Sequence, residues 1–168
     1  RQVKDGVLDW KSAGLSLAVV FERYGKNGNI GYGLVEGALT KPGAVATTWS
    51  HDSHNLFVLG TDENDMKLAQ RRVLELQGAY VVFAEGRSLA EAGLTIGGIV
   101  SDHRIEVLGQ ELKEVRTAME GLGYVNNNVI MSMSTLCLPV SPKLKLTDHG
   151  LLTVPGQEHV PLVEKYGK

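Results

Sequence analysis

The apolar residues of the chain change their spacing several times, and each change marks the boundary of a predicted element. Short apolar runs bounded by glycine, proline or polar turn residues are typical of strands. Between residues 30 and 40 glycines interrupt the pattern, so either a strand or a helix fits that stretch. Strands are predicted at residues 15–23, 44–50, 55–60, 79–84 and 87–92, a strand-like stretch at 131–140 and a hairpin at 144–154.

Two segments instead place their apolar residues three and four positions apart, which is the spacing of an amphipathic helix. The first covers residues 61–77 and carries acidic residues at its start, where the helix dipole favours negative charge. The second covers about residues 103–122 and follows Ser101 and Asp102, either of which is a suitable N-cap.

The order of these elements predicts the fold class. Strands, a helix, a hairpin, a second helix and further strands do not alternate as βαβ units do. The prediction is therefore α+β, with a mixed or mostly antiparallel sheet and two main helices packed on one face. The length of 168 residues fits a single domain, 1–168, with an ordered core at about 14–164. The first residue is not methionine, so we expect a piece of a longer protein.

Composition narrows the class of partner. The net charge is -2 and no Lys/Arg cluster stands out, which argues against a nucleic-acid partner. No apolar run approaches the ~20 residues of a membrane-spanning helix. The single cysteine, Cys137, rules out an internal disulfide and suits a reducing compartment, so a cytoplasmic location is expected.

The richest chemistry lies in residues 51–55, His-Asp-Ser-His-Asn, between two apolar runs. In a tight turn, His51 and His54 can reach one metal or one substrate, whereas an extended strand would point them to opposite faces. Asp52 and Asn55 could orient the two rings. Two histidines do not complete a metal site, so an ion would need other ligands. Alternatively, Asp52, Ser53 and Asn55 are loop formers that bond their own backbone.

Three other places carry weaker signals. Ser101 and Asp102 follow a glycine pair and are either a substrate-facing group or a helix cap. The pair Asp148 and His149 sits in a predicted turn, where a turn-forming role is favoured. Cys137 lies in an apolar stretch, which favours a buried structural thiol.

Several motifs occur in a fixed order along the chain, and together they are more specific than any one alone. The motifs are His-Asp-Ser-His-Asn at 51–55, followed by 56–66, 75–82, 94–102 and 133–151. The series resembles the C-terminal domain of bacterial adenine deaminases, in the amidohydrolase superfamily, from about Leu17 to Val163.

This resemblance implies a function for the full-length protein. The family hydrolyses adenine to hypoxanthine and ammonia in a (β/α)8 barrel that holds a binuclear metal centre, Mn or Fe. The barrel's metal-binding motifs would lie upstream, and this chain contains no His-X-His pair. The resemblance therefore implies an adenine deaminase whose isolated C-terminal chain is inactive, and no cofactor is firmly predicted for this chain alone.

The resemblance also gives the 51–55 motif a role at the mouth of the barrel. The expected partners are the upstream barrel domain of the same protein, adenine and further copies in a homo-oligomer. The alternatives are a non-catalytic interaction or oligomerisation domain with a structural histidine loop, and a self-sufficient nucleobase- or metal-binding module. The catalytic candidates are His51, Asp52 and His54, the substrate-binding candidates are Ser53, Asn55, Ser101 and Asp102, and His51 and His54 are tentative ligands of an auxiliary metal.

Overall fold

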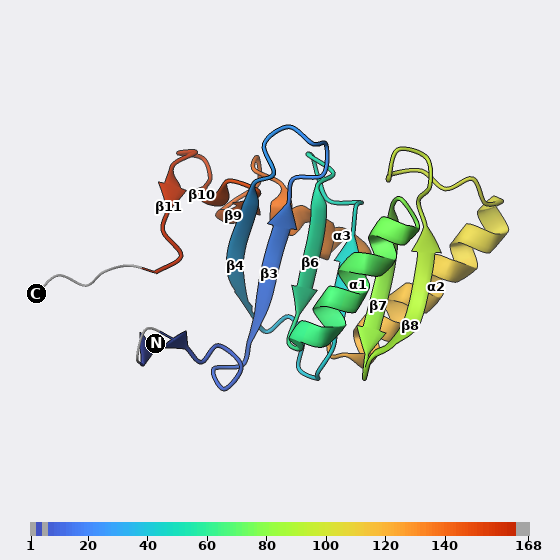
Figure 1. Cartoon of the computed structure of the whole chain (residues 1–168), viewed down its shortest axis with the longest axis horizontal. Helices are drawn as coiled ribbons and strands as arrows, with labels where there is room; N and C mark the ends of the chain where they lie inside the picture. The colour runs from blue at the N-terminus through green and yellow to red at the C-terminus, as the bar shows by residue number, and fades with distance from the viewer. Residues whose placement is uncertain (1–2, 5–6, 164–168) are drawn as a thin grey trace, which may run out of the picture.

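A six-stranded antiparallel sheet forms the centre of the molecule (Figure 1). The computed structural model describes residues 3–4 and 7–163. Every neighbouring pair of strands in this sheet is antiparallel, which confirms the predicted α+β class and sheet type. In sheet order the strands are β4 (Ile30–Glu36), β3 (Leu15–Phe21), β6 (Leu56–Gly60), β5 (Ala44–Thr47), β7 (Ala79–Ala84) and β8 (Arg87–Gly93).

The two main helices cover opposite faces of this sheet, so the prediction that both pack on one face is wrong. Helix α1 (Glu63–Glu75) packs with the side of β7 that carries Val81 and Phe83. Helix α2 (Ile105–Gly121) packs with the other side, where Tyr80 and Val82 lie. The strands are apolar on both sides, so each face needs its own cover. A contiguous apolar run does not reveal which face a given helix takes.

The C-terminal third extends the α2 side of the sheet. Where a strand-like stretch was predicted, the chain forms a helix that begins with an Asn128 side chain accepting from the backbone N–H of Met131, 3.1 Å away. A short apolar run fits either a strand or a helix, and here the Asn128 N-cap stabilises the helix. The remaining elements are α3 (Val129–Ser134), the 3-10 turn η1 (Thr135–Cys137), β9 (Leu144–Thr147), β10 (Gly150–Thr153), β11 (His159–Val160) and the N-terminal β1 (Val3–Lys4) and β2 (Val7–Leu8).

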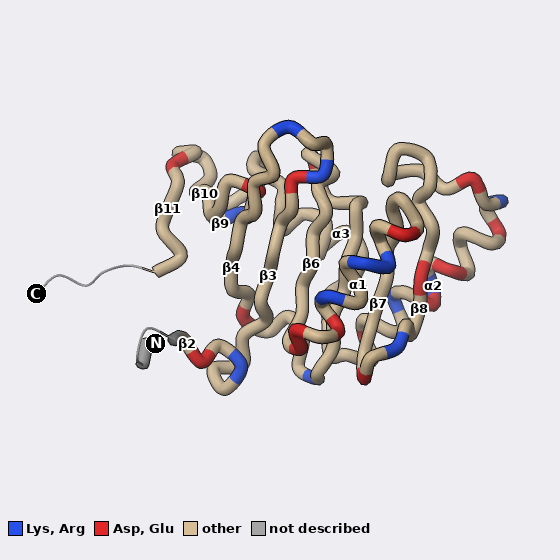
Figure 2. The backbone as a smooth tube through the Cα atoms, in the orientation of Figure 1, with Lys and Arg blue, Asp and Glu red and all other residues tan. Residues whose placement is uncertain are grey.

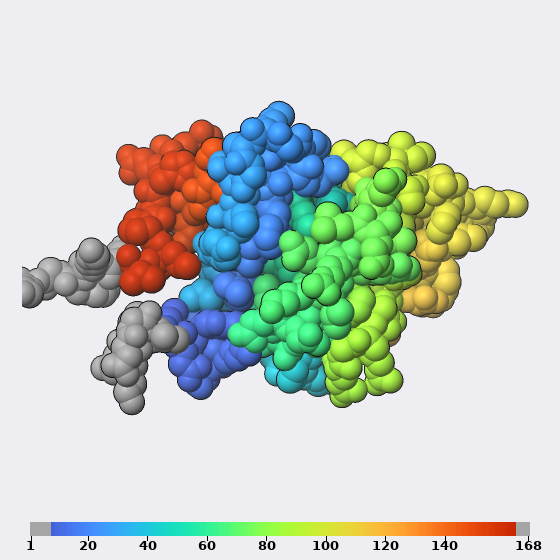
Figure 3. All heavy atoms as spheres, in the orientation of Figure 1, coloured from blue at the N-terminus to red at the C-terminus, as the bar shows by residue number. Residues whose placement is uncertain are grey.

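The predicted hairpin at 144–154 is β9–β10, and it lies directly against β4 (Figure 3). Two glycines of β4 make this close approach possible. A Cβ placed on Gly31 would lie 1.9 Å from the Thr147 carbonyl oxygen, and one on Gly33 would lie 3.2 Å from a methyl group of Leu146. The hairpin is therefore positioned by a main-chain contact at Gly31 together with the packing of Leu146 into the core.

Charge is spread along the chain rather than gathered in one place. Figure 2 shows acidic and basic residues interspersed over both helices and the connecting loops. Within the described ranges, no helix has the length and apolar character needed to cross a membrane.

Candidate functional site

The loop 51–55 joins β5 to β6 and turns tightly enough to bring its two imidazoles together. The ring centroids of His51 and His54 are 5.3 Å apart, and the ring of Trp49 lies 4.9 Å from that of His51. His54 has a φ of 51°, in the left-handed region that reverses the chain direction within one residue. Of the two geometries considered for this motif, the structure has the one that places both rings side by side.

The His54 ring lies in an environment that favours its neutral form. Its Nδ1 atom is buried and has no hydrogen-bond partner in the described part of the chain. Burial, followed by the neighbouring His51 and Arg23, lowers the pKa of His54, while the Thr48 backbone and Asp52 act in the opposite direction. A neutral imidazole with an unengaged nitrogen can accept or relay a proton near neutral pH.

Two residues just after β3 hold this loop in place. The Arg23 guanidinium donates from Nε to the His54 carbonyl and from Nη2 to the Gly97 carbonyl, the latter at 2.7 Å. It also stacks on the ring of Tyr24, with 4.6 Å between the guanidinium carbon and the ring centroid. The Tyr24 hydroxyl donates to the Ser53 carbonyl at 2.8 Å. Arg23 and Tyr24 thus fasten the loop to the end of β3 and to the 97–98 turn.

Asn55 is part of this scaffold. It is 3% exposed, and its Oδ1 accepts from the backbone N–H of Arg23 at 3.4 Å. Its own N–H donates to the Ser53 hydroxyl at 3.3 Å. The exposed residues of the motif are Asp52 and Ser53, and the two imidazoles are partly buried.

Ser101 and Asp102 lie apart from the loop's polar groups. The N-cap of α2 is Arg104, without a side-chain hydrogen bond, so the prediction that one of the two caps this helix is wrong. The Ser101 hydroxyl accepts from the backbone of His103 at 3.2 Å, and Asp102 accepts from the Thr95 hydroxyl at 3.0 Å. These bonds stabilise the loop before the helix, a turn that the sequence pattern does not separate from a cap.

Ser101 does line a mostly apolar pocket that begins beside the histidine loop. The pocket has a volume of about 280 Å³ and includes Trp49, whose ring contacts His51. Val100 at its rim is 54% exposed. Its other lining residues are Tyr80, Leu94, Ile99, Leu108, Leu112 and Ile130.

On the other side of the loop is a groove of about 380 Å³ lined by both polar and apolar side chains. Asp52 and Ser53 form one wall, and Asp148 and His149 from the β9–β10 turn form part of the other. The sequence favoured only a turn-forming role for Asp148 and His149. They do lie in the turn, but the fold also places them across from the histidine loop, a proximity of residues about a hundred positions apart that no local pattern reveals. The other lining residues are Cys137, Pro139, Thr147, Leu152, Gln157 and His159.

Cys137 lines this groove. Its thiol is buried, as predicted. Burial raises its pKa to about 12. Because the thiolate is the nucleophilic form, this thiol stays protonated and contributes packing rather than chemistry.

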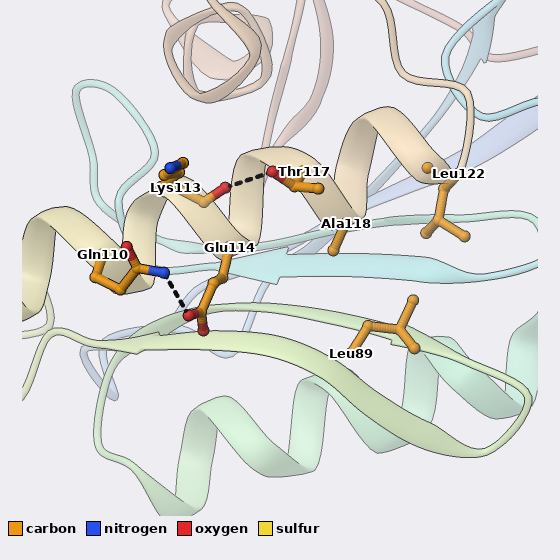
Figure 4. A pocket seen from close by; sticks show the side chains of 8 residues that line it. Leu89, Gln110, Lys113, Glu114, Thr117, Ala118 and Leu122 are labelled. Carbon is orange, nitrogen blue, oxygen red and sulfur yellow. Dashed lines mark hydrogen bonds between the residues drawn. The ribbon is translucent and has the colours of Figure 1, made fainter.

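A larger hollow than these two lies elsewhere, between α2 and the edge strand β8 (Figure 4). Its volume is about 570 Å³, and Leu89, Ala118 and Leu122 form its apolar side. Gln110 donates to Glu114 along the polar rim at 2.8 Å. None of the predicted site residues lines it.

Comparison with known proteins identifies the family. The family described as adenine deaminase C-terminal domain matches residues 1–158. An adenine deaminase of Clostridium perfringens (strain 13 / Type A) is 51% identical over 163 residues, and adenine deaminase 2 of Oenococcus oeni is 50% identical over 161. The chain belongs to the adenine deaminase C-terminal domain family. The match covers 97% and 96% of this chain but only 28% of the length of each relative, and it confirms the resemblance found in the motifs.

The family resemblance implies a metal centre, and the residues of this adenine deaminase C-terminal domain do not fit one. In the described part of the chain, no group of three or more His, Cys, Asp or Glu side chains could hold a metal ion. His51 and His54 are adjacent but lack a third ligand. No step of the chemistry is therefore assigned to a metal bound within this domain.

Proposed function

We propose that this chain is the C-terminal domain of a longer adenine deaminase, which converts adenine and water to hypoxanthine and ammonia. In this proposal the chain is one domain that packs on an upstream catalytic barrel, and its 51–55 loop faces the active-site mouth. The observation that carries the proposal is the pair of adjacent imidazoles, 5.3 Å apart, on a loop fastened by Arg23 and Tyr24. The Mn or Fe binuclear centre would belong to the barrel.

The chemistry of the loop suits this role. Hydrolytic deamination of a purine needs groups that take up and deliver protons at the ring nitrogen and the leaving amine. His54 has a lowered pKa and an unengaged Nδ1, so it can accept a proton at neutral pH. His51 lies between His54 and the open groove side at Asp52, with its Nδ1 3.5 Å from the Asp52 carboxylate. His51 thus places a second imidazole and the Asp52 carboxylate beside His54.

The surface around the loop suits a neighbouring domain. Soluble monomers rarely leave a contiguous apolar surface uncovered. The apolar pocket beside Trp49, with Val100 exposed at its rim, offers such a surface next to the loop. The relatives are more than three times as long as the matched segment, which leaves ample chain to cover it.

The proposal is tested in the full-length gene product. We expect adenine deaminase activity with added Mn(II) in the full-length protein and none in this chain alone. His51→Ala and His54→Ala should each lower turnover by about 100-fold or more, the range of general acid–base contributions, with a much smaller loss of stability.

The matched control is His103→Ala, which removes an imidazole 2.9 Å from Glu111 on helix α2 and outside the loop. Its turnover should equal that of the wild type. If the two loop variants lose activity only in proportion to their loss of folded protein, the loop is a structural corner and the proposal is wrong.

A second candidate function is a non-catalytic interaction or oligomerisation domain. The observation that favours it is the open edge of β8, flanked by the 570 Å³ hollow along α2 (Figure 4). Under this alternative, Leu89→Asp should change the oligomeric state of the full-length protein in sedimentation experiments, while loop variants leave turnover unchanged.

A further inference from the structure

One face of the paired strands β3 and β4 is apolar where a solvated sheet would be polar. Residues directly opposite each other in an antiparallel pair share a face of the sheet. A face built for water carries polar side chains at these positions, whereas here they are all aliphatic or aromatic. The opposed pairs on this open face are Leu17 with Leu34, Val19 with Tyr32, and Phe21 with Ile30.

The open face lies beside helix α1 but is not covered by it. The helix packs on β5, β6 and β7, and no helix of the described chain lies in front of β3 and β4 in Figure 1. A groove of about 240 Å³ remains between them, with Phe21, Val58 and Met66 on its apolar side and Lys67 and Gln70 on the helix. Soluble monomers rarely leave such a contiguous apolar surface bare, so an occupant is expected.

The preceding part of the polypeptide reaches the domain beside this groove. The chain enters the sheet at Leu15, the first residue of β3. Shortly before it, the Lys11 ammonium forms an ion pair with the carboxylate of Glu63, a residue that lines the groove. In the relatives, a match to a C-terminal domain over 28% of the length leaves most of the chain before the matched segment. A preceding domain is thus tethered next to the open face, and tethering raises its effective concentration above that of a second copy in dilute solution.

The far end of the open face adjoins the histidine loop. Phe21 pairs with Leu56, which directly follows the loop 51–55. Arg23, two residues after Phe21, donates to the His54 carbonyl. A neighbour that lies along β3 therefore reaches from the point where the chain enters the sheet to the loop that the proposed function places at the active-site mouth.

We infer that the preceding domain of the same polypeptide docks on the open face through an apolar surface of its own. The inference rests on the proposed function, in which an upstream domain packs on this one, and deepens it by naming the surface used. Ile30 and Tyr32 are 44% and 49% exposed and form the centre of the contact. The Tyr32 ring supplies apolar area while its hydroxyl can bond to polar groups of the neighbour. Lys67 and Gln70 form the polar border on the helix side.

Hydroxyl-radical footprinting of the full-length protein measures whether Tyr32 is covered. Mass spectrometry gives the modification rate of each residue, which is divided by its rate in urea. Tyr32 should react as slowly as Tyr80, a tyrosine that is 1% exposed within this domain. Leu74, 59% exposed on α1, should stay reactive. A Tyr32 rate well above that of Tyr80 would overturn the inference.

Cross-linking from Lys67 identifies what covers the face. Lys67 is exposed and lines the groove, so a lysine-reactive reagent should link it to lysines of the preceding domain. The sample is an equal mixture of unlabelled and isotopically labelled full-length protein. Links between peptides of the same label support the inference. Links that join the two labels would place a second copy on the face and overturn it.

Ile30→Thr and Ile105→Thr make the same substitution at two exposed positions, one on the open face and one at the start of α2. In the full-length protein, Ile30→Thr should raise the modification rate of Tyr32 and lower the thermal midpoint by about 2–4 °C. Ile105→Thr, 74% exposed on the other side of the sheet, should change neither. Equal behaviour of the two variants would count against docking at the open face.

A deaminase assay of the wild type separates this inference from the proposed function. If the wild type is active on adenine while Tyr32 stays reactive, the docking surface is wrong and the proposed function stands. If Tyr32 is protected and Lys67 links to the preceding domain in a protein that is inactive on adenine, the docking surface stands and the proposed function falls. Failure of both overturns both.

Discussion

His54 combines burial with positive neighbours, and this combination makes the stability of the fold depend on pH. In the folded state these surroundings lower its pKa below the ordinary 6.5, so the unfolded chain binds this proton more readily. The free energy of unfolding should therefore fall as the pH is lowered through 6.5 and level off below the folded-state pKa.

Urea titrations at pH 5, 6, 7 and 8 check this prediction. His54→Gln cannot take up the proton, so its stability should change less between pH 7 and pH 5 than that of the wild type. Parallel pH profiles for the two proteins would show that His54 is not the group responsible.

At the same scale, the sequence predicted part of the candidate site and missed the rest. The segment 51–55 was identified because its polar groups are contiguous and interrupt two apolar runs. Arg23 was not identified from the sequence. Its guanidinium donates to the carbonyl groups of His54 and Gly97, and these two groups become neighbours only after the sheet forms. Asp148 was assigned a turn role, and nothing in its local sequence shows what faces that turn.

At the scale of elements, the contact between β4 and the β9–β10 hairpin leaves no room for a side chain. Gly31→Ala would place a methyl group against the Thr147 carbonyl, which is main chain and has little freedom to move. The substitution should destabilise the domain by about 1–3 kcal/mol, as overpacking does.

Gly109→Ala is the matched control, since a Cβ there meets no atom within 4 Å and the residue lies inside α2. It should be neutral or stabilising by up to about 1 kcal/mol. Urea denaturation of both variants measures the difference, and equal stabilities would show that the hairpin does not rest on the backbone of β4.

Most strands and both long helices could be predicted from the sequence, but the way these elements pack against one another could not. The predicted strands at 79–84 and 87–92 match β7 and β8 closely, because glycine turns and apolar runs mark their ends. The face that each helix covers depends on the pairing of strands distant in sequence. The short helix α3 was mistaken for a strand because a run of that length has no readable period.

At the scale of the whole molecule, α2, α3 and the hairpin cover one face of the six-stranded sheet, whereas α1 on the other face packs on β5, β6 and β7. The β3 and β4 part of that face stays open, with Ile30 and Tyr32 44% and 49% exposed. A neighbouring domain can therefore meet this one at that open surface or at the ends and edges of the sheet. The histidine loop, the apolar pocket at Trp49 and the groove at Asp52 all lie at one end, where β5 leads into β6 and β3 leads into Arg23.

Val100→Asp tests whether the neighbouring domain packs against this end of the sheet. Val100 is 54% exposed at the rim of the apolar pocket, so in this chain alone the substitution should change stability by no more than about 0.5 kcal/mol. In the full-length protein the new charge would be buried against the barrel, and the thermal midpoint and turnover should both fall. Val107→Asp, at a 47% exposed position outside the pocket, should change neither. Equal behaviour of the two variants in the full-length protein would place the barrel elsewhere.

The glycine contact beneath the β9–β10 hairpin has a consequence for how this domain can be altered. Because main chain meets main chain at Gly31, the separation of β4 from the Thr147 carbonyl is set by the backbone at this point. The turn that follows Thr147 is therefore tied to the edge of the sheet, and an exposed groove residue such as Gln157 can be exchanged while this contact is kept.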